Sequence, residues 1–567
     1  MLMMKYLTTG LNGIFLLLLL GVTTTGLTQN LNIPADHPAN DVVERWLISN
    51  SSKDIHPAIR PFNRNDWAQL ILKKKINAHL NPKDSTNLLY SMIENQDFIN
   101  CDSCKPVLKS RKPLLTYFYK TPADLLEFKS DYFYLKLNPV FGMTIGKEKG
   151  NESNIFENSR GIELRGGIDS KVYFYSRILE TQKRFENYIT DRINRFNAVP
   201  SNGFYKNYNS SIFDVKNGFD FNNATAYIGF NVTKHIGAQF GYGNNFIGNG
   251  IRSLLLSDYS NNYLYFKLNT KVGRFHYQNI FGELQAAGAR DDIGDVLIPK
   301  KYFAAHYLSY AINKNWHAGI FETVVFARKD HFDFQYLNPV ILYRSVEAAL
   351  GSPDNVLIGF NVSGNIAHTV QLYGQLMLDE FLFRELIKDN RGWWANKFGL
   401  QGGIKYINVL GVDHLDLQLE ANLVMPYTYT HADSTASYTH YNQALAHPLG
   451  ANLVEGIARV KYRILPSLQT ECWLQHYKQG LDSNTSNWGE NILTTNTSRV
   501  SDYGNKLLQG LRTNVTRLTF RLEWNFFHNM NAFGEYSYRR QTGYNEQTLH
   551  YAGAGFKINI GSKPLLL

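Results

Sequence analysis

A strictly alternating pattern of apolar and polar residues over 413–423 is the feature that most constrains the fold of this chain. The segment reads DHLDLQLEANL, and from Leu415 onward one parity is entirely apolar. The other parity carries an imidazole, carboxylates and amides: His414, Asp416, Gln418, Glu420 and Asn422. Successive side chains of a strand point to opposite faces, so this period predicts a strand between two different surroundings. A sandwich strand, apolar on a core and polar in water, would give the same pattern.

The same alternation recurs in other long segments, which argues against a sandwich. In RLTFRLEWNFF, residues 517–527, Leu518 and Phe520 share the apolar parity while Arg517 and Arg521 share the polar one. The segment NYLYFKLN, residues 262–269, alternates in the same way. Strands of about nine to eleven residues with one apolar and one charged face are typical of a transmembrane β-barrel with a wet lumen.

Connections of two kinds alternate along residues 131–567. Short ones contain GIDSK, NVTKH, NTKVG, INKNW, SGNIAH, NVLGVD, RILPS and FHNMN. Long ones lie between them, near residues 181–222, 245–261, 285–300, 327–353, 380–396, 426–450 and 479–513. Alternation and turn signals together give about eighteen strand candidates. We therefore predict an all-β transmembrane barrel of about 18 antiparallel strands, closed so that no sheet edge is left unpaired.

The first 28 residues have the layout of a secretory signal peptide. Lys5 gives a positive start, residues 13–22 form a short apolar run, and the small residues of TTTGLTQN suit a cleavage site. We predict that residues 1–28 direct export. Because a barrel of this kind spans the outer membrane of a Gram-negative bacterium, we expect the mature protein there.

Helical rather than strand periodicity marks the segment between the signal peptide and the barrel. Apolar residues recur at i, i+3 and i+4 in three places: Val43, Trp46 and Leu47; Trp67, Leu70 and Ile71; and Leu89, Met92 and Ile93. Asn63 or Asn65 is the expected cap of the second helix, and KDST, residues 83–86, precedes the third. Residues 29–130 are therefore predicted to form a small α-helical domain on the periplasmic side.

Cys101 and Cys104 form a C-x-x-C pair directly after the third predicted helix. In an exported protein this spacing favours a local disulfide, and a redox motif and a metal site are the alternatives. A redox motif lacks a thioredoxin-like context here, and a metal site lacks a second ligand pair. We predict a structural disulfide, and we expect no metal or cofactor.

The net charge of +10, with a sequence pI ≈ 9.1, bears on the possible partners. Nucleic acid is not expected as a partner of an exported barrel. Acidic polysaccharide and lipid phosphate are available at a cell surface, and both attract basic patches. Scattered, solvated Lys and Arg side chains would give the same net charge.

Two predicted long loops carry the side chains that sugars require, namely aromatic faces and planar donors. In DNRGWWANK, residues 389–397, Arg391, Trp393 and Trp394 are candidates for a stacking platform with an arginine clamp. The alternative places both tryptophans in the interfacial aromatic girdle. In NYITDRINRFNAV, residues 187–199, Arg192 and Arg195 are candidates for contact with an anionic polymer, or else belong to a solvated helical loop.

A second set of candidates is a polar network in the lumen or the loops. The segment SLLLSD, residues 253–258, is unusually apolar for an extracellular loop, and we expect it to fold back into the lumen. Its flanking charges would then meet charges of the barrel interior. The candidate members are Arg252, Asp258, Arg344, Glu347, Asp379 and Glu380. This segment and NPVILY, residues 338–343, are both predicted to fill the lumen, which argues against an open porin.

Motifs of the common hydrolases are missing from the sequence. Neither G-x-S-x-G nor H-E-x-x-H occurs, and the histidines are scattered. The run RDDIGD offers Asp291, Asp292 and Asp295 to Ca²⁺, but it departs from an EF-hand loop and is more often a solvated turn. We predict a non-enzymatic protein without catalytic residues.

Three segments, in order along the chain, resemble segments of the Wzi family of capsule-assembly outer-membrane proteins. They are GYGNNFIGNGIRSLLLSD at 241–258, FQYLNPVILYRSVE at 334–347 and QLYGQLMLDEF at 371–381. The resemblance implies an outer-membrane lectin that anchors capsular polysaccharide at the cell surface. The aromatic lead-in at 117–140 is more similar to a branch that resembles the gliding-motility protein RemB, which occurs in gliding bacteria with type IX secretion.

These observations lead to one principal hypothesis and two alternatives. The principal one is a barrel that binds or anchors surface polysaccharide and contacts outer-membrane lipid, including lipopolysaccharide. The first alternative, which the resemblance implies, is a component of gliding motility, adhesion or type IX secretion, with motility or secretion proteins as partners. The second is a porin-like channel, since a barrel of this size leaves a pore unless something fills it.

Overall fold

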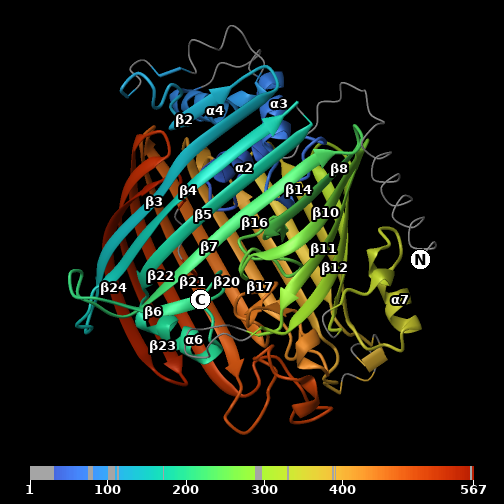
Figure 1. Cartoon of the computed structure of the whole chain (residues 1–567). Helices are drawn as coiled ribbons and strands as arrows, with labels where there is room; N and C mark the ends of the chain where they lie inside the picture. Colours follow the sequence, from blue (N-terminus) through green and yellow to red (C-terminus); the bar gives the residue numbers. More distant parts are fainter. Residues whose placement is uncertain are drawn as a thin grey trace, which may run out of the picture.

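The predicted barrel is present in the computed structural model of the chain, where eighteen antiparallel strands form a closed wall (Figure 1). The structure describes residues 31–74, 81–99, 109–110, 114–169, 171–287, 297–328, 331–382, 384–385, 389, 391–561 and 565–567. The predicted signal peptide at 1–28, the pair Cys101 and Cys104, and the aspartates Asp291, Asp292 and Asp295 lie outside the described residues. Those three interpretations stay predictions.

Each wall strand pairs with its sequence neighbour, and the last strand pairs with the first. The wall strands are β3 (Phe133–Glu148), β4 (Ile155–Ile168), β5 (Val172–Arg184), β7 (Val215–Asn231), β8 (Ile236–Gly243), β10 (Tyr263–Val272), β11 (Phe275–Gln285), β12 (Lys300–Ala311), β13 (Trp316–Phe326), β14 (Asn355–Ile366), β15 (Val370–Leu378), β16 (Phe398–Tyr406), β17 (Leu415–Val424), β20 (Leu453–Leu465), β21 (Leu468–Leu481), β22 (Leu511–Phe527), β23 (Met530–Gly543) and β24 (Gln547–Ile558). Strand β24 closes the wall against β3, with Ile558 opposite Phe141.

Shorter strands pair beside or inside the wall. Strand β2 (Leu126–Lys129) pairs with β3, and β6 (Tyr205–Ser210) pairs with β7. Two further ladders are only two residues long: β1 (Ile59–Arg60) with β9 (Phe246–Ile247), and β18 (Thr439–His440) with β19 (Gln443–Ala444). All four residues of the β18 and β19 ladder are buried, as are Ile59, Phe246 and Ile247.

The two faces of the wall follow the parity of the sequence. Along β17, Leu419 is 43% exposed on the outside whereas Glu420 is 3% exposed in the lumen. On β22, Leu518 and Phe520 face outward and Arg517 faces inward. On these two strands the exterior is therefore apolar and the lumen side is polar, which is the arrangement that a barrel needs in lipid. Among the described helices, none is both long and apolar enough to cross a membrane.

The connections differ between the two ends of the barrel. At one end, here named the turn end, they are short: 169–171, 232–235, 273–274, 312–315, 367–369, 407–414, 466–467 and 528–529. At the other, the loop end, the long ones are 185–214, 244–262, 286–299, 327–354, 379–397, 425–452 and 482–510. Two connections at the loop end, 149–154 and 544–546, are short as well, so the predicted alternation fails beside β3 and β24.

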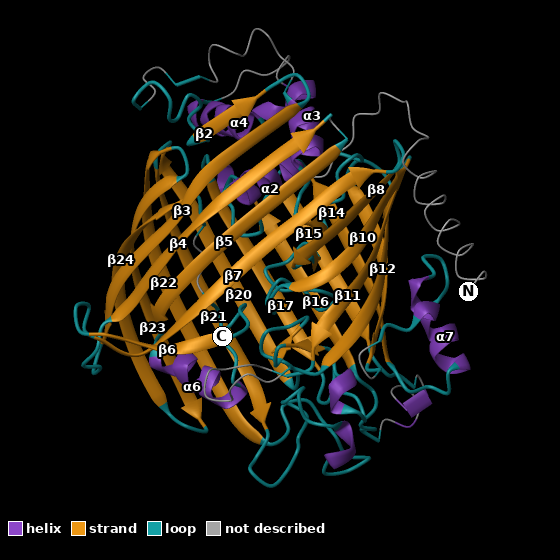
Figure 2. Cartoon of the chain, in the orientation of Figure 1, coloured by secondary structure: helices purple, strands orange, loops and turns teal. Residues whose placement is uncertain are grey.

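Three helices gather at the turn end, as Figure 2 shows: α2 (Ala39–Asn50), α3 (Arg64–Lys74) and α4 (Pro82–Glu94). Their apolar faces form one core in which Trp46 meets Trp67 edge to face, with ring centroids 5.9 Å apart. Asn63 accepts hydrogen bonds from the amides at the start of α3, as predicted. The third helix begins earlier than predicted, because Asn81 caps it and Pro82 occupies its first turn.

Residues 31–74 and 81–99 are named the plug here, because they are bonded to the turn end of the barrel. Asp66 pairs with Lys271, and Asp84 pairs with His414 at 3.0 Å. Glu94 accepts from His528 and Asn529 in the turn between β22 and β23. The plug thus contacts turns on opposite sides of the circuit.

The loop 327–354 lies on the outside of the wall, where Figure 1 shows α7 (Tyr343–Ala349) beside the barrel. Tyr336 and Tyr343 pack on Tyr302 and Phe326, which belong to the outward face of β12 and β13. The prediction that NPVILY fills the lumen is therefore wrong. The apolar side chains of a loop are removed from water equally well when they pack against the outer wall.

The lumen is filled instead by the loop 244–262, as predicted, and by the loop 425–452. Leu254, Leu255 and Leu256 are fully buried in the largest apolar cluster of the molecule. The hydroxyls of Tyr429 and Tyr438 donate to the backbone oxygens of Leu254 and Leu255 at 2.9 and 2.8 Å. Two loops that are far apart in sequence therefore interlock inside the barrel.

Candidate functional site

Arg252 is the centre of a buried polar network that holds the loop 244–262 in the lumen. Its guanidinium donates to both carboxylate oxygens of Glu455, over 3.1 and 2.8 Å. The backbone amides of Ile251 and Arg252 donate to the carboxylate of Glu420, over 2.6 and 3.0 Å. This bidentate pairing to β20, with two further bonds to β17, places the loop against one side of the wall.

Glu455 has several donors in addition to Arg252. His447 Nε2 lies 2.9 Å from its carboxylate, Gln475 donates over 2.7 Å and Asn422 over 3.2 Å. A buried carboxylate is tolerated when its lone pairs are satisfied in this way. Because His447 belongs to the loop 425–452, the network joins both lumen loops to the barrel.

Asp379 and Glu380 form a separate cluster, although we predicted that they join Arg252. The Lys397 ammonium lies 3.1 Å from each carboxylate, and the Tyr429 amide donates to Asp379 over 2.7 Å. Arg252 instead bonds to Glu420, to Glu455 and to the backbone oxygen of Leu566, and its own backbone oxygen accepts from Gln401 over 3.0 Å. The prediction of one shared network is therefore corrected to two ion clusters with different cations.

The Asp379 carboxyl gives the site a predicted pH dependence. Burial, only partly opposed by Lys397, raises its pKa to about 6. The value in the unfolded chain is about 3.9, so the folded state binds the extra proton between these two values. Its contribution to stability is therefore fully present below about pH 4 and is lost as the pH rises through about 6.

We therefore expect Asp379→Asn to raise the thermal unfolding midpoint more at pH 7.5 than at pH 4, because the amide cannot ionise. The measurement is the midpoint of the detergent-purified chain at the two pH values. Asp433→Asn, at an exposed aspartate of the loop 425–452, is the matched control and should show no such difference. Equal shifts of the Asp379→Asn midpoint at both pH values would contradict the prediction.

Arg344 and Glu347 pair with each other on α7, outside the barrel and away from the lumen loops. Their side chains meet at 2.7 Å, and 63% of the Arg344 side chain is exposed. The Arg344 amide also donates to Glu322 of β13. Asp258 lies at the loop end, where its backbone oxygen accepts from Asn244 over 3.3 Å. The predicted polar network is therefore divided over separate places in the molecule.

The tryptophan pair lies where the loops 379–397 and 482–510 meet. The rings of Trp393 and Trp394 are 6.3 Å apart, edge to face. Arg499 lies 4.1 Å above the Trp394 ring, and the guanidinium of Arg391 lies 4.4 Å from the Tyr503 ring. Both arginines thus make cation–π contacts within the protein, and Arg391 also forms an ion pair with Glu385. This arrangement leaves Trp393 as the less engaged ring of the pair.

Arg192 and Arg195 extend from α6 (Asn187–Phe196), which lies at the loop end. Both guanidinium groups lie within 5 Å of the Phe196 ring centroid, at 4.8 and 4.9 Å. Arg192 donates to the backbone oxygen of Pro448 over 2.7 Å, and Arg195 pairs with Glu490 at 2.7 Å. Burial raises the pKa of the Glu490 carboxyl, although Arg195 opposes this effect.

A small pocket opens between α6 and the loops 425–452 and 482–510. Its cavity volume is about 30 Å³, and its polar lining combines an arginine, a carboxylate and amides: Arg192, Glu490, Asn442, Gln443 and Asn491. Phe196 and Tyr259 supply aromatic rings to the same lining. Planar donors and acceptors beside an aromatic face are the chemistry that recognises sugar hydroxyls and acidic groups. This set is named the loop-end pocket below.

The loop-end pocket contains residues that sequence reasoning missed. The sequence points to Arg192 because two arginines and Phe196 lie together in one predicted loop. Asn442, Gln443, Glu490 and Asn491 come from two other loops, at least 240 residues further along the chain. Nothing in their local sequence distinguishes these amides and this carboxylate from solvated loop residues.

A larger cavity runs along the inner wall of β4, β5 and β7. Its volume is about 410 Å³. At the loop end it is lined by Asn202, Asp258 and Asn262, and near the plug by Asn32 and Pro61. The lumen loops therefore leave polar space on this side of the barrel.

The fold and the loop end together define a closed, lumen-filled β-barrel with a polar pocket at one end. No protein-family model and no curated protein sequence matches this chain. Among solved structures, the chain is similar to Wzi, an outer-membrane protein involved in group 1 capsule assembly in Escherichia coli, described as a carbohydrate-binding β-barrel. The identity is 13%, the TM-score is 0.55, and the match covers 95% of this chain and 100% of Wzi.

More distant matches are to outer-membrane proteins of Pseudomonas aeruginosa. OprD matches with 10% identity and a TM-score of 0.39, over 75% of this chain and 95% of its own. OprE matches with 9% identity and a TM-score of 0.41, over 76% of this chain and 98% of its own. The similarity to Wzi extends over nearly the whole chain, so the shared feature is the complete barrel fold.

Proposed function

We propose that this chain is an outer-membrane barrel that binds surface polysaccharide at its loop end. The observation that carries the proposal is the group of side chains around the loop-end pocket, where Arg192 and Glu490 lie beside an aromatic ring and amides. Because the cavity itself has room only for water, the glycan would lie across its mouth. The similarity in fold to a barrel described as carbohydrate-binding supports it. No catalytic role is proposed for these residues.

The proposed orientation places the loop end outside the cell and the plug in the periplasm. The apolar exterior of the strands supports insertion in a bilayer, and long loops of such barrels face outward while short turns face the periplasm. The basic side chains of α6 would then meet acidic groups of a polysaccharide or of lipopolysaccharide at the cell surface.

The test is binding of the detergent-purified chain to the capsular polysaccharide of its own host. Arg192→Ala should weaken binding about tenfold, because a hydrogen bond to a charged group is worth about 1.5–3 kcal/mol and 1.4 kcal/mol is tenfold in affinity. Trp393→Ala tests the other candidate surface in the same assay. Arg344→Ala, which removes an exposed arginine outside the barrel, is the matched control and should bind as the wild type does.

The outcomes separate the candidate surfaces. A loss with Arg192→Ala alone assigns the glycan to the loop-end pocket, whereas a loss with Trp393→Ala alone assigns it to the tryptophan pair. Saturable binding that neither substitution weakens would contradict both assignments. No binding by a folded wild-type barrel would overturn the proposal and favour the motility or secretion hypothesis from the sequence.

A further inference from the structure

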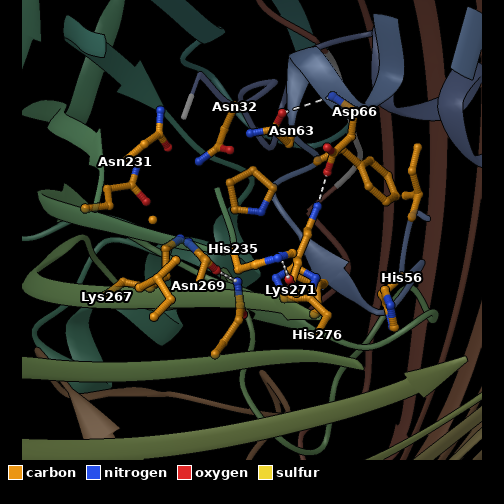
Figure 3. Close-up of a pocket in the computed structure, with 18 of the residues that line it drawn as sticks. Asn32, His56, Asn63, Asp66, Asn231, His235, Lys267, Asn269, Lys271 and His276 are labelled. Atoms are coloured by element: carbon orange, nitrogen blue, oxygen red, sulfur yellow. Dashed lines mark hydrogen bonds and ion pairs between the residues drawn. The ribbon is translucent and has the colours of Figure 1, made fainter. Parts of the chain in front are cut away.

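A third cavity, a polar chamber smaller than the cavity along β4, β5 and β7, lies at the turn end between the plug and strands β8, β10 and β11 (Figure 3). Its volume is about 70 Å³. A cavity of this size holds a few waters or one small polyatomic ion. Its lining includes Asp66, Lys234, Gln239, Lys267, Lys271 and His276. It lies at the opposite end of the barrel from the loop-end pocket.

Positive charge exceeds negative charge in this chamber. Three lysines line it, and Asp66 is the one carboxylate among the described residues of its lining. Figure 3 shows Lys271 reaching upward to Asp66, so this carboxylate is already paired. Two ammonium groups, those of Lys234 and Lys267, are left without that partner.

Lys267 is the more unusual of these two lysines because it is buried. It is 3% exposed, and its ammonium donates to the amide oxygen of Asn245 over 2.9 Å. The ring of Tyr265 lies 5.3 Å from the same nitrogen. No carboxylate in the described part of the chain forms an ion pair with it. Burial disfavours the charged form of such a lysine, so an anion beside it would stabilise the ammonium.

Two buried side-chain nitrogens in the chamber lining also lack partners. The amide nitrogen Nε2 of Gln239 and the ring nitrogen Nε2 of His276 make no hydrogen bond to the described residues. Gln239 is 1% exposed and His276 is 6% exposed, so bulk water does not reach them freely. Native proteins rarely leave buried polar groups unsatisfied, and an ion that accepts hydrogen bonds would satisfy the Gln239 amide and the His276 tautomer with its proton on Nε2.

We propose that the turn-end chamber binds a small oxyanion of the phosphate class. Such an ion offers several acceptor oxygens to Gln239 and His276 and a negative charge to Lys267. A metal cation does not fit, because the lining holds more ammonium groups than carboxylates. The ion is either free phosphate or the phosphate of a lipid headgroup, which present the same oxygens to the chamber. This site is independent of the proposed glycan binding.

The test is calorimetric titration of the detergent-purified full chain with sodium phosphate, at constant ionic strength set with sodium chloride. Saturable binding by the wild type and at least tenfold weaker binding by Lys267→Met are expected. Lys301→Met is the matched control, because Lys301 is equally buried, has no ion pair among the described residues and donates to Ser437 and Thr439 away from the chamber. Its phosphate affinity should equal that of the wild type.

A second variant covers the case in which Lys267→Met does not fold. Gln239→Leu keeps the size of the side chain, removes the unpartnered donor and should weaken phosphate binding as well. Absence of saturable binding by the folded wild type would overturn the proposal, as would equal binding by Gln239→Leu and the wild type. Displacement of bound phosphate by a short-chain phosphatidate identifies a lipid headgroup as the source. Retention of phosphate in its presence identifies the free ion.

Discussion

The double substitution Leu254→Asp/Leu255→Asp is expected to raise the ion conductance of the barrel by about tenfold or more, because it expels the loop 244–262 from the lumen. Both leucines are fully buried, and they fit against small residues of the wall. A methyl group added at Gly359 would lie 2.2 Å from Leu255 Cδ2, and one at Gly399 would lie 3.2 Å from Leu254 Cδ1. The loop is therefore seated closely on β14 and β16.

Two aspartates at these positions would be buried without cations. The penalty for an unpaired buried ion is several kcal/mol each, which exceeds what two hydrogen bonds from Tyr429 and Tyr438 return. When the loop 244–262 leaves the lumen, the aspartates become solvated and this penalty disappears. The polar cavity along β4, β5 and β7 then becomes wider. Barrels of sixteen to eighteen strands conduct ions when nothing fills them.

The measurement is single-channel conductance in planar bilayers, with the wild type as the reference. Leu337→Asp/Leu342→Asp is the matched control, because both leucines are exposed in the loop outside the barrel. It should leave conductance unchanged. A closed Leu254→Asp/Leu255→Asp barrel that is folded in the bilayer would show that the loop does not close the lumen.

The strands could be predicted from the sequence because the pleat requires a period of two. Glu420 and Leu419 differ in exposure for that reason alone, and the same rule assigned Arg517 to the lumen and Leu518 to the exterior. The position of an apolar loop could not be predicted in the same way. The lumen core and the outer wall both accept apolar side chains, so NPVILY and SLLLSD look alike in sequence although they lie on opposite sides of the wall.

The partners of the site residues depend on the closed circuit rather than on local sequence. Arg252 was predicted to meet acidic groups of the lumen, and it does, but its partner is Glu455 instead of Asp379. Both carboxylates lie at the inner face or loop end, and only the spatial order of β15, β17 and β20 decides between them. The same holds for Arg192, whose hydrogen-bond acceptor, the backbone oxygen of Pro448, lies 256 residues further along the chain.

Glu94→Ala is expected to release the plug from the barrel while the strands stay folded. Glu94 is 1% exposed, and its carboxylate accepts hydrogen bonds from His528 over 2.8 Å, from Asn529 over 2.6 Å and from Arg64 over 3.1 Å. It therefore bonds helix α4 to α3 and to the turn between β22 and β23. Removing one member of a buried ion network costs about 3–5 kcal/mol, because the remaining charges stay buried without a counterion.

The stabilisation that Glu94 provides depends on pH, because the pKa of its carboxyl is shifted. Burial opposes its ionisation, but His37, His528 and Arg64 together hold its pKa well below the usual range. A depressed carboxyl pKa contributes stability above the unfolded value of about 4.3, and this contribution is lost as the pH falls through the folded pKa. The loss of stability caused by Glu94→Ala, relative to the wild type, should therefore be greatest at pH 7 and smaller in strong acid.

Hydrogen exchange resolves the plug from the barrel wall. At pH 7 the amides of α2, α3 and α4 should lose protection by more than about a hundredfold in Glu94→Ala, which corresponds to the 3–5 kcal/mol above. The amides of β22 and β23 should keep their protection, because the wall is closed without the plug. Ser85→Ala, at an exposed position of the same helix, is the control and should change little. If plug and strands lost protection together, the plug would be part of the barrel's cooperative unit, and Glu94 would stabilise the whole fold rather than a detachable closure.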